Sequence, residues 1–226
     1  MCGRKTLTKD MRSIIEELAI EEWENPDNYI PSYNIAPTQI SPILIDEGKR
    51  IVKPMRWGLI PSWAKDDKFA SKMINARIET LTEKPSYKNL LTNNRCIVIT
   101  DGYYEWKQSG GHKIPYYIKH PDDKLIPMAG LYDVWKSSDG NIIPSYTVIT
   151  KPSREHIAEI HERMPAVLSQ DAIGGWLNSN DTSKIDLLKF VQASKSELIK
   201  YPVSTLVNSV SNNSPECIKS SDVSWS

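Results

Sequence analysis

The stretch that decides the fold runs from Arg95-Cys-Ile-Val-Ile-Thr100 into Asp101-Gly-Tyr-Tyr-Glu-Trp106 and on to Lys119. Its β-branched and aromatic residues favour strands at 95–100, 103–107 and 114–119. Gly next to Asp or Ser separates these runs, a combination typical of tight turns. Strands that follow one another through such short turns predict an antiparallel, meander-like sheet.

The same pattern continues on both sides of this stretch. Downstream, strands are predicted at 125–135 and 142–150, separated by the turn residues Ser138-Asp139-Gly140. Upstream, a hairpin is predicted with strands at 42–45 and 49–59.

Apolar residues at helical spacing predict a first helix at about 9–24, with Thr8 as its N-cap. A second helical segment is predicted at 80–94, interrupted by Pro85. Two more helices are predicted at 154–160 and 170–178, with Ser153 and Ser169 as N-caps.

Nothing divides the 226 residues into separate parts. We therefore predict one domain over residues 1–218, followed by a flexible, Ser-rich tail over 219–226. Strands and helices do not alternate as in βαβ units, and neither GxGxxG nor a Walker A pattern is present. The predicted class is α+β with a mainly antiparallel sheet.

The composition is that of a soluble globular protein, with 25% charged and 39% hydrophobic residues and zero formal net charge. Overall charge therefore gives no attraction to nucleic acid, and any such contact would depend on a local basic groove. Three cysteines without a CxxC pair, and four histidines without ligand spacing, predict neither disulfides nor a metal. No membrane span or signal peptide is recognisable, so we expect a cytoplasmic protein.

Cys2 is the residue with the most distinctive chemistry. A small residue after the initiator Met permits removal of Met1, which leaves a thiol and an α-amine on adjacent carbons. The amine has a pKa of ~8 and the thiol of ~8.5, so both are nucleophiles near neutral pH. Such a pair converts an aldehyde into an imine and then closes a five-membered thiazolidine. The residue type alone is equally compatible with an ordinary second residue.

Glu105 and His161 are candidates for proton transfer. Glu105 lies between Tyr104 and Trp106, where burial would raise the pKa of its carboxyl group, although strand alternation equally allows it to face solvent. His161 lies where a helix is predicted to end, and imidazole titrates near neutral pH. A lone histidine is more often structural, and nothing in the local sequence excludes that role.

Four further residues suit contacts with a substrate or a nucleic acid. Asn75 would orient a reacting amine, and Arg77 would bind a phosphate through two parallel hydrogen bonds. Trp57 and Trp63 would stack on bases. Surface and core positions are the ordinary alternatives for these residue types.

These residues lie in motifs whose order and spacing resemble the SRAP family, the SOS response-associated peptidases. The resemblance covers essentially the whole chain. The motifs are Met1-Cys-Gly-Arg4, Tyr33-Asn-Ile-Ala-Pro37, Arg56-Trp-Gly-Leu-Ile-Pro61, Asn75-Ala-Arg-Ile-Glu-Thr80, Arg95-Cys96, Asp101-Gly-Tyr-Tyr-Glu-Trp106, His161-Glu-Arg-Met-Pro165, Pro202-Val-Ser204 and Val207-Asn208.

The resemblance implies one α+β domain with a strongly bent, barrel-like sheet and a basic groove over Cys2. It implies binding to single-stranded DNA and a thiazolidine cross-link between mature Cys2 and the aldehyde of a ring-opened abasic sugar. Glu105 would be the acid–base, His161 would assist proton transfer and reversal of the link, and Asn75 would hold the Cys2 end.

The same resemblance assigns phosphate contacts to Arg77 and Arg4. Trp63 and its loop would hold the strand or wedge beside a duplex end. No metal or organic cofactor is implied, and we expect a monomer.

Three other functions remain open. The family name favours a cysteine autopeptidase that uses Cys2, His161 and Glu105 and removes Met1. A non-catalytic module that shields single-stranded DNA is the second. An N-terminal-Cys amidohydrolase is the third, and short turn-linked strands disfavour the layered sandwich that it needs. A covalent adduct on an abasic oligonucleotide, stable in a denaturing gel, distinguishes the cross-linking function from the autopeptidase and from the shielding module.

Overall fold

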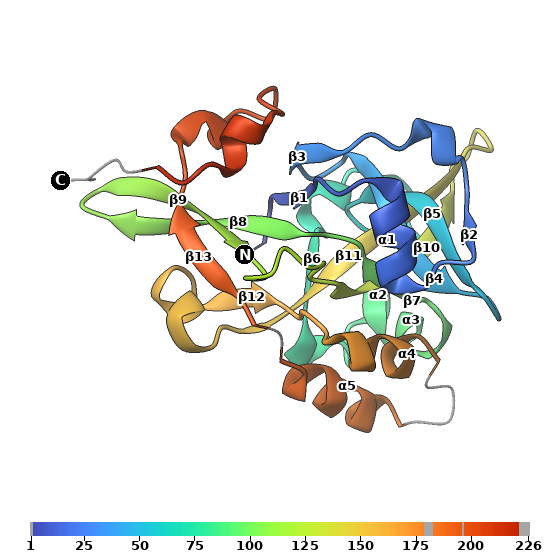
Figure 1. Cartoon of the computed structure of the whole chain (residues 1–226). Coiled ribbons are helices and arrows are strands. Elements are labelled where there is room, and N and C mark those ends of the chain that lie inside the picture. The colour runs from blue at the N-terminus through green and yellow to red at the C-terminus, as the bar shows by residue number, and fades with distance from the viewer. Residues whose placement is uncertain (1, 179–182, 196, 222–226) are drawn as a thin grey trace.

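Two β-sheets share the main hydrophobic core in the computed structural model, which describes residues 2–178, 183–195 and 197–221 (Figure 1). The first sheet is antiparallel throughout. Its strand order is β13 (Ile199–Pro202), β9 (His112–Lys119), β8 (Gly102–Ser109), β1 (Lys5–Leu7) and β3 (Ser32–Ile35). Of the predicted flexible tail, 222–226 lie outside the described residues.

The second sheet closes on itself. Its strand order is β12 (Arg163–Pro165), β11 (Ile142–Pro152), β10 (Met128–Lys136), β7 (Arg95–Val98), β4 (Ile40–Asp46), β5 (Arg50–Trp57) and β2 (Glu22–Trp23), and β6 (Asn75–Arg77) also pairs with β11. Parallel pairing of Arg56 with Ser145 and of Trp57 with Tyr146 joins β5 to β11 and completes a ring. The predicted α+β class and the barrel-like, mainly antiparallel sheet are confirmed.

The ring closes at a glycine that no other residue could replace. Gly58 follows β5 with φ of 121°, and its N–H donates to the carbonyl oxygen of Tyr146 over 2.9 Å. A Cβ at this position would lie 2.5 Å from the carbonyl oxygen of Ala70. The Trp57-Gly58 pair therefore belongs to the closure of the ring, where only glycine fits.

The chain changes sheets at Asp101, so the prediction of one continuous meander is wrong. β7 pairs with β4 and β10 in the second sheet, whereas β8 pairs with β1 and β9 in the first. The Asp101 carboxylate accepts hydrogen bonds from the hydroxyls of Thr6 and Thr8, at 2.5 and 2.7 Å. Because these bonds tie the turn to β1, the turn acts as a crossover between the sheets.

The first helix is shorter than predicted. α1 covers Met11–Leu18, and Asp10, not Thr8, is its N-cap, accepting the N–H of Ser13 over 3.0 Å. Thr8 is unavailable as a cap because its backbone N–H and hydroxyl both bind Asp101. The helix ends at Ala19, which adopts a left-handed conformation with φ of 49°.

The other predicted helices differ in form. The segment predicted at 80–94 contains two short helices, and Pro85 begins the first of them rather than interrupting it. The segment predicted at 154–160 is a 3-10 turn whose N-cap is Arg154 rather than Ser153. The helix predicted at 170–178 is confirmed, whereas the helix at 184–193 was not predicted. The elements concerned are η3 (Ile78–Thr80), α2 (Pro85–Lys88), α3 (Leu90–Asn93), η4 (Glu155–Glu159), α4 (Gln170–Asn178) and α5 (Lys184–Ala193), and further 3-10 turns are η1 (Pro26–Asn28), η2 (Ala70–Lys72), η5 (Thr205–Asn208) and η6 (Pro215–Ile218).

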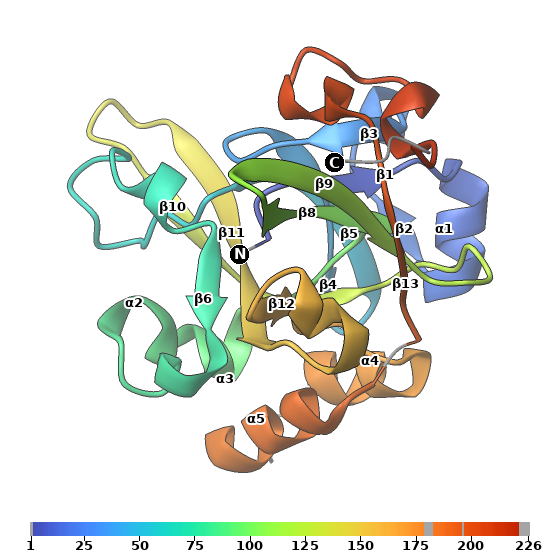
Figure 2. The same ribbon diagram turned by 90° about the vertical axis from the view of Figure 1, so that its left-hand side faces the viewer.

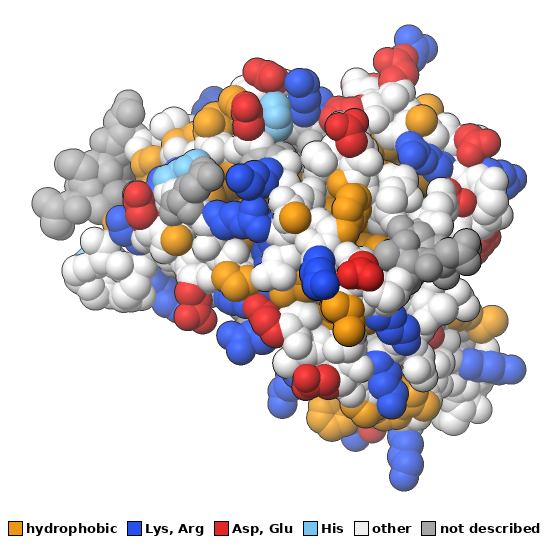
Figure 3. Space-filling model, turned by 90° about the horizontal axis from the view of Figure 1, so that it is seen from below, with side chains coloured by type: hydrophobic (Ala, Val, Ile, Leu, Met, Phe, Trp, Pro, Cys, Tyr) orange, Lys and Arg blue, Asp and Glu red, His pale blue; other side chains and the backbone are white. Residues whose placement is uncertain are grey.

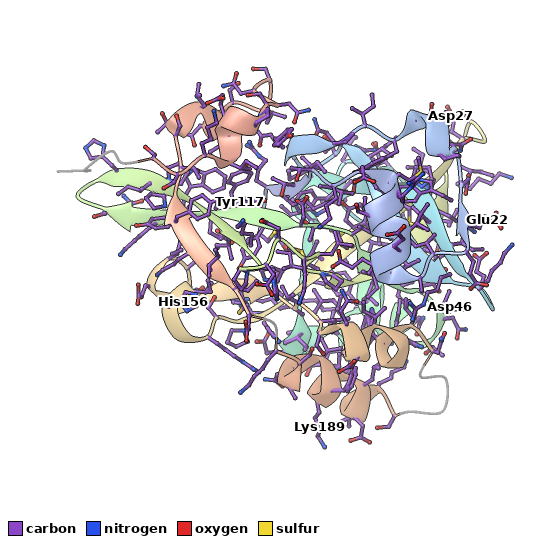
Figure 4. All side chains as sticks on the ribbon, viewed as in Figure 1. Glu22, Asp27, Asp46, Tyr117, His156 and Lys189 are labelled. Atoms are coloured by element: carbon purple, nitrogen blue, oxygen red, sulfur yellow. The ribbon has the colours of Figure 1, made fainter. Side chains whose placement is uncertain are left out.

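One face of the first sheet packs against the main hydrophobic core, and the other packs against the C-terminal 3-10 turns. α4 and α5 lie together at one end of the molecule, and η5 and η6 lie at the opposite end beside β3 (Figures 1 and 2). Tyr104 and Tyr117 pack against Val207 and Cys217 of the C-terminal turns, and Figure 4 labels Tyr117 beneath that segment. No helix among the described residues is long and apolar enough to cross a membrane.

Candidate functional site

Cys2 lies just ahead of β1 and is completely buried. Its carbonyl oxygen accepts a hydrogen bond from the side-chain amide of Asn75 over 2.7 Å. Asn75 is the first residue of β6, where its backbone pairs in parallel with Val148 of β11. The second sheet therefore places an amide donor against the residue that leads into the first sheet.

Glu105 points into the core from β8 and is only 3% exposed. Lys5 of β1 pairs with Tyr103 of β8, so those two side chains and that of Glu105 occupy one face of the first sheet. Burial raises the pKa of Glu105 to about 7. A carboxyl group with such a pKa exchanges protons efficiently near neutral pH.

The thiol of Cys2 is held in its protonated form. Burial raises the pKa of Cys2 to about 12, and the negative charge of Glu105 contributes in the same direction. Because a neutral thiol is a poor nucleophile, a reaction at the sulfur requires a base. Glu105, whose charge acts on the thiol, is suited to be that base.

His161 shares a cavity with Glu105. The cavity has a volume of about 510 Å³ and is lined by Glu105, Trp106, Lys113, His161 and Asn208. The backbone N–H of Arg163 donates to Nδ1 of His161 over 3.0 Å, so the neutral imidazole carries its proton on Nε2. Burial lowers the pKa of His161, which favours this neutral form at pH 7.

An ion pair anchors the strand that positions His161. Arg163 is 6% exposed, and its guanidinium makes two hydrogen bonds with the Glu79 carboxylate, at 2.5 and 3.0 Å. It also donates to the carbonyl oxygen of Thr150 over 2.7 Å. These bonds hold β12, and with it the N–H that fixes the His161 tautomer.

Trp57 is a core residue, which corrects the prediction that it stacks on DNA bases. Its side chain is fully buried, its Nε1–H donates to the carbonyl oxygen of Ile74 over 3.0 Å, and its ring stacks on that of Tyr146. Trp57 pairs with Tyr146 where β5 meets β11, and both residues belong to the main hydrophobic core.

The other predicted DNA contacts differ in exposure. Trp63 is 66% exposed, and the Arg77 side chain is 56% exposed with Glu162 4.0 Å away. Arg4 instead turns inward: its Nη1 donates to Asn34 over 2.7 Å and to the Val207 carbonyl over 2.6 Å. Trp63 and Arg77 are therefore accessible to a ligand, whereas Arg4 joins β3 to the C-terminal turns.

The surface and the ligand set also bear on the chemistry. Basic and acidic side chains are interspersed over the face seen from below (Figure 3), so this face has no continuous field of one sign.

Within the described ranges, no group of three or more His, Cys, Asp or Glu residues is arranged to hold a metal ion. Figure 4 labels His156, whose Nε2 lies 2.8 Å from the carbonyl oxygen of Leu198.

The whole chain, and not only the site formed by Cys2, Asn75, Glu105 and His161, resembles a known family. Residues 1–210 match the family model described as SOS response associated peptidase (SRAP). The chain belongs to the SRAP family.

Named relatives in the SRAP comparison include bacterial and vertebrate proteins. The abasic site processing protein YoqW of Bacillus subtilis (strain 168) is 44% identical over 97% of this chain and 100% of the relative. The abasic site processing protein HMCES of Gallus gallus is 38% identical over 87% of this chain and 68% of the relative. A solved structure from Bacteroides thetaiotaomicron has a TM-score of 0.86 at 25% identity and covers 97% of this chain and 100% of its own.

Two buried residues of this SRAP chain were not predicted from the sequence to belong to the site. Lys5 and Tyr103 are both fully buried on the face that carries Glu105. The hydroxyl of Tyr103 has no hydrogen-bond partner in the described part of the chain. Burial, the Cys2 thiolate and the Glu105 carboxylate together raise the pKa of Tyr103 well above its usual value, so the phenol stays neutral. Only the register of β1 against β8 reveals that these side chains share a face.

Proposed function

We propose that this chain is an abasic-site processing protein, which binds single-stranded DNA and links Cys2 covalently to the ring-opened abasic sugar. The names of YoqW and HMCES support the processing role. The observation that carries the chemistry is a buried Cys2, held by Asn75, next to a carboxyl group whose pKa burial raises to about 7. These groups supply the nucleophile, its anchor and a proton carrier.

The reaction proceeds in two bond-forming steps after Met1 has been removed. The α-amine of Cys2 attacks C1′ of the aldehyde, and loss of water leaves a C=N bond. The sulfur then adds to the same carbon, the electron pair of the C=N bond moves to nitrogen, and nitrogen takes the thiol proton. The product is a thiazolidine, and one water leaves in total.

Glu105 and His161 divide the proton transfers. Protonated Glu105 donates to the oxygen that departs as water and takes a proton back from the nitrogen, which leaves the neutral imine. In its carboxylate form, Glu105 then accepts the thiol proton and passes it to the nitrogen. A pKa of about 7 keeps both forms of Glu105 populated near neutral pH. Neutral His161 donates from Nε2 to a sugar oxygen, and the same contact assists reversal of the link.

A single strand fits the exposed residues better than a duplex does. Trp63 is exposed and offers a stacking surface, while Arg77 is exposed and offers a phosphate contact. The aldehyde of an abasic site in an intact duplex is harder for a buried Cys2 to reach. Binding should therefore weaken with salt, as phosphate contacts do.

A peptidase step at the same residue is the second candidate, favoured by the family description. Attack of the Cys2 site on the preceding peptide bond, with hydrolysis, would release Met1 and expose the α-amine. This hydrolase activity would prepare the lyase-like cross-linking activity. The two activities therefore need not exclude each other.

One mixing experiment tests the proposal. Purified protein is incubated with a single-stranded oligonucleotide that carries one abasic site, and the product is analysed by denaturing gel and intact mass. We expect an adduct whose mass is the sum of the two components less one water. Cys2→Ala should abolish it, and Cys2→Ser should leave only an imine that borohydride traps.

The chain supplies its own matched controls. Cys96 and Cys217 are also free and buried, so Cys96→Ala and Cys217→Ala test for a general thiol effect. Both variants should cross-link like the wild type. An adduct at wild-type yield from Cys2→Ala would contradict the proposal. Binding without any covalent product would favour a shielding module.

A further inference from the structure

Lys5 places a buried ammonium group on the reactive face of the first sheet. Its side chain is fully buried, and its Nζ donates to the carbonyl oxygen of Ile99 over 3.2 Å. The other N–H groups of Nζ have no hydrogen-bond partner in the described part of the chain. A buried charge with a single partner is costly, so the fold retains it against a free-energy penalty.

The register of the first sheet orients Lys5 toward the reactive residues. Lys5 pairs with Tyr103 across β1 and β8, and Glu105 follows Tyr103 by two residues. Residues paired across strands, and those two apart along a strand, point to the same side of a sheet. Lys5, Tyr103 and Glu105 therefore share one side of the sheet, and each of the three interacts electrostatically with Cys2.

Two groups that carry negative charge when ionised interact with the Lys5 ammonium: the Cys2 thiol, once it loses its proton, and the Asp101 carboxyl group. Asp101 is already satisfied, because Thr6 and Thr8 donate hydrogen bonds to both of its oxygens. The Cys2 sulfur is less fully satisfied, since the backbone N–H of Arg4 is the hydrogen-bond donor that acts on it in the described part of the chain. The charge of Lys5 is thus most effective when negative charge develops on that sulfur.

We propose that Lys5 is a positioning residue that stabilises the Cys2 thiolate during closure of the thiazolidine ring. This inference rests on the proposed cross-linking function and adds a residue to it. Lys5 keeps its own proton throughout. The thiol proton moves by way of Glu105 to the ring nitrogen, and Lys5 contributes only its charge.

The protonation of Lys5 sets the pH range in which it acts. Burial lowers the pKa of Lys5 to about 8, so the group is charged at pH 7 and neutral above pH 9. The ionisable groups that face it are Cys2, Asp101, Tyr103 and Glu105. These four groups are present in both wild type and a Lys5 variant. The ratio of the variant's cross-linking rate to the wild-type rate at each pH therefore isolates the effect of Lys5.

The test compares Lys5→Met and Lys5→Arg with wild type on the abasic oligonucleotide between pH 6 and 10. An opposite charge nearby lowers a pKa by ~1–3 units. Loss of the Lys5 charge therefore lowers the fraction of Cys2 that is thiolate, which slows the reaction. Part of this loss is offset, because the more basic thiolate of the variant is a stronger nucleophile. We expect Lys5→Met to slow cross-linking about 3–10-fold at pH 7. The ratio should approach one above pH 9, and borohydride should trap more imine from Lys5→Met.

Lys5→Arg keeps its charge at every pH, so its rate should match wild type at pH 7 and exceed it above pH 9. Lys9→Met, at the partly exposed Lys9–Glu17 pair, is the matched control and should leave the profile unchanged. A constant ratio for Lys5→Met across the range would overturn the inference, as would equal imine trapping. If Lys5→Met does not fold, Lys5→Arg supplies the test: a Lys5→Arg rate equal to the wild-type rate above pH 9 would also overturn the inference. Absence of the adduct from wild type would instead refute the proposed function.

Discussion

The amide nitrogen of Asn75 lies 2.7 Å from the carbonyl oxygen of Cys2, and this bond connects the two sheets at the reactive residue. Asn75 is fixed by the parallel pairing of β6 with β11, and Cys2 precedes β1 in the other sheet. Fixing the Cys2 carbonyl restricts the peptide plane that follows it. The amine and thiol of the same residue are thereby oriented relative to Glu105.

Substitutions at Asn75 should separate this anchoring role from a merely structural one. Asn75→Ala removes the hydrogen bond, worth ~1 kcal/mol, so we expect cross-linking to slow by up to about tenfold. Asn75→Asp should be slower still, because it sets a carboxylate oxygen against the Cys2 carbonyl. Single-turnover rates from quenched gels measure both effects. Asn75→Asp cross-linking at the wild-type rate would show that the bond does not orient Cys2.

Glu105→Gln should remove the pH dependence that a proton carrier confers. The pKa of Glu105 is raised from 4.5 to about 7, and we expect the variant to cross-link ~10²–10⁴-fold more slowly at pH 7. The buried carboxylate also destabilises the native state as pH rises from 4.5 to 7. Glu105→Gln should therefore gain stability over wild type across that window, on the order of 3 kcal/mol. Urea unfolding at pH 4 and pH 8 measures the difference, and equal stability gaps at both would contradict a raised pKa.

The sequence predicted the class of the fold better than its connectivity. The strand runs and turn residues around Asp101 identified β7, β8 and β9 correctly. They could not reveal that Asp101 begins a crossover, because its binding to Thr6 and Thr8 joins segments more than ninety positions apart. Local propensity carries no information about such long-range contacts.

The site was predictable where a motif marks it and unpredictable where only register does. Cys2, Asn75, Glu105 and His161 lie in recognisable motifs, and the structure brings Asn75 to Cys2 and His161 to the cavity of Glu105. Lys5 belongs to none of the residues that the motifs single out, and a lysine next to an arginine is normally predicted to be exposed on the surface. Trp57 was assigned to base stacking because it is aromatic, but an aromatic side chain suits the core equally well, and the structure buries Trp57 completely.

Glu79 should affect reversal of the cross-link only through His161. Glu79→Gln removes the anion that holds Arg163, whose N–H fixes the His161 tautomer. We expect Glu79→Gln to slow reversal several-fold, and to have no further effect in a His161→Ala background. Glu47→Gln, at the surface pair Lys53–Glu47, is the control and should change nothing. Additive effects of Glu79→Gln and His161→Ala would show that Glu79 acts elsewhere.

The tryptophans should separate strand binding from stability. Trp63 is exposed, and stacking of one base is worth ~1–3 kcal/mol, so Trp63→Ala should weaken single-strand affinity by about tenfold or more without changing stability. Trp57→Ala should instead destabilise the protein by ~3–5 kcal/mol, because it empties the ring. Fluorescence anisotropy and urea unfolding measure the two quantities. Ile185→Ala, at an exposed apolar residue of α5, is the control and should alter neither.

A non-removable extension at the N-terminus should eliminate the thiazolidine while leaving the thiol intact. An extension converts the α-amine of Cys2 into an amide, which is neither basic nor nucleophilic. A mechanism that uses only sulfur, as in an ordinary cysteine peptidase, would survive this change, whereas an aminothiol mechanism would not. We therefore expect native protein to lack Met1 by intact mass, and an extension after Ser226 to be harmless. Equal cross-linking by the N-terminally extended protein would show that the amine takes no part, and would leave the thiol-only peptidase as the better account of Cys2.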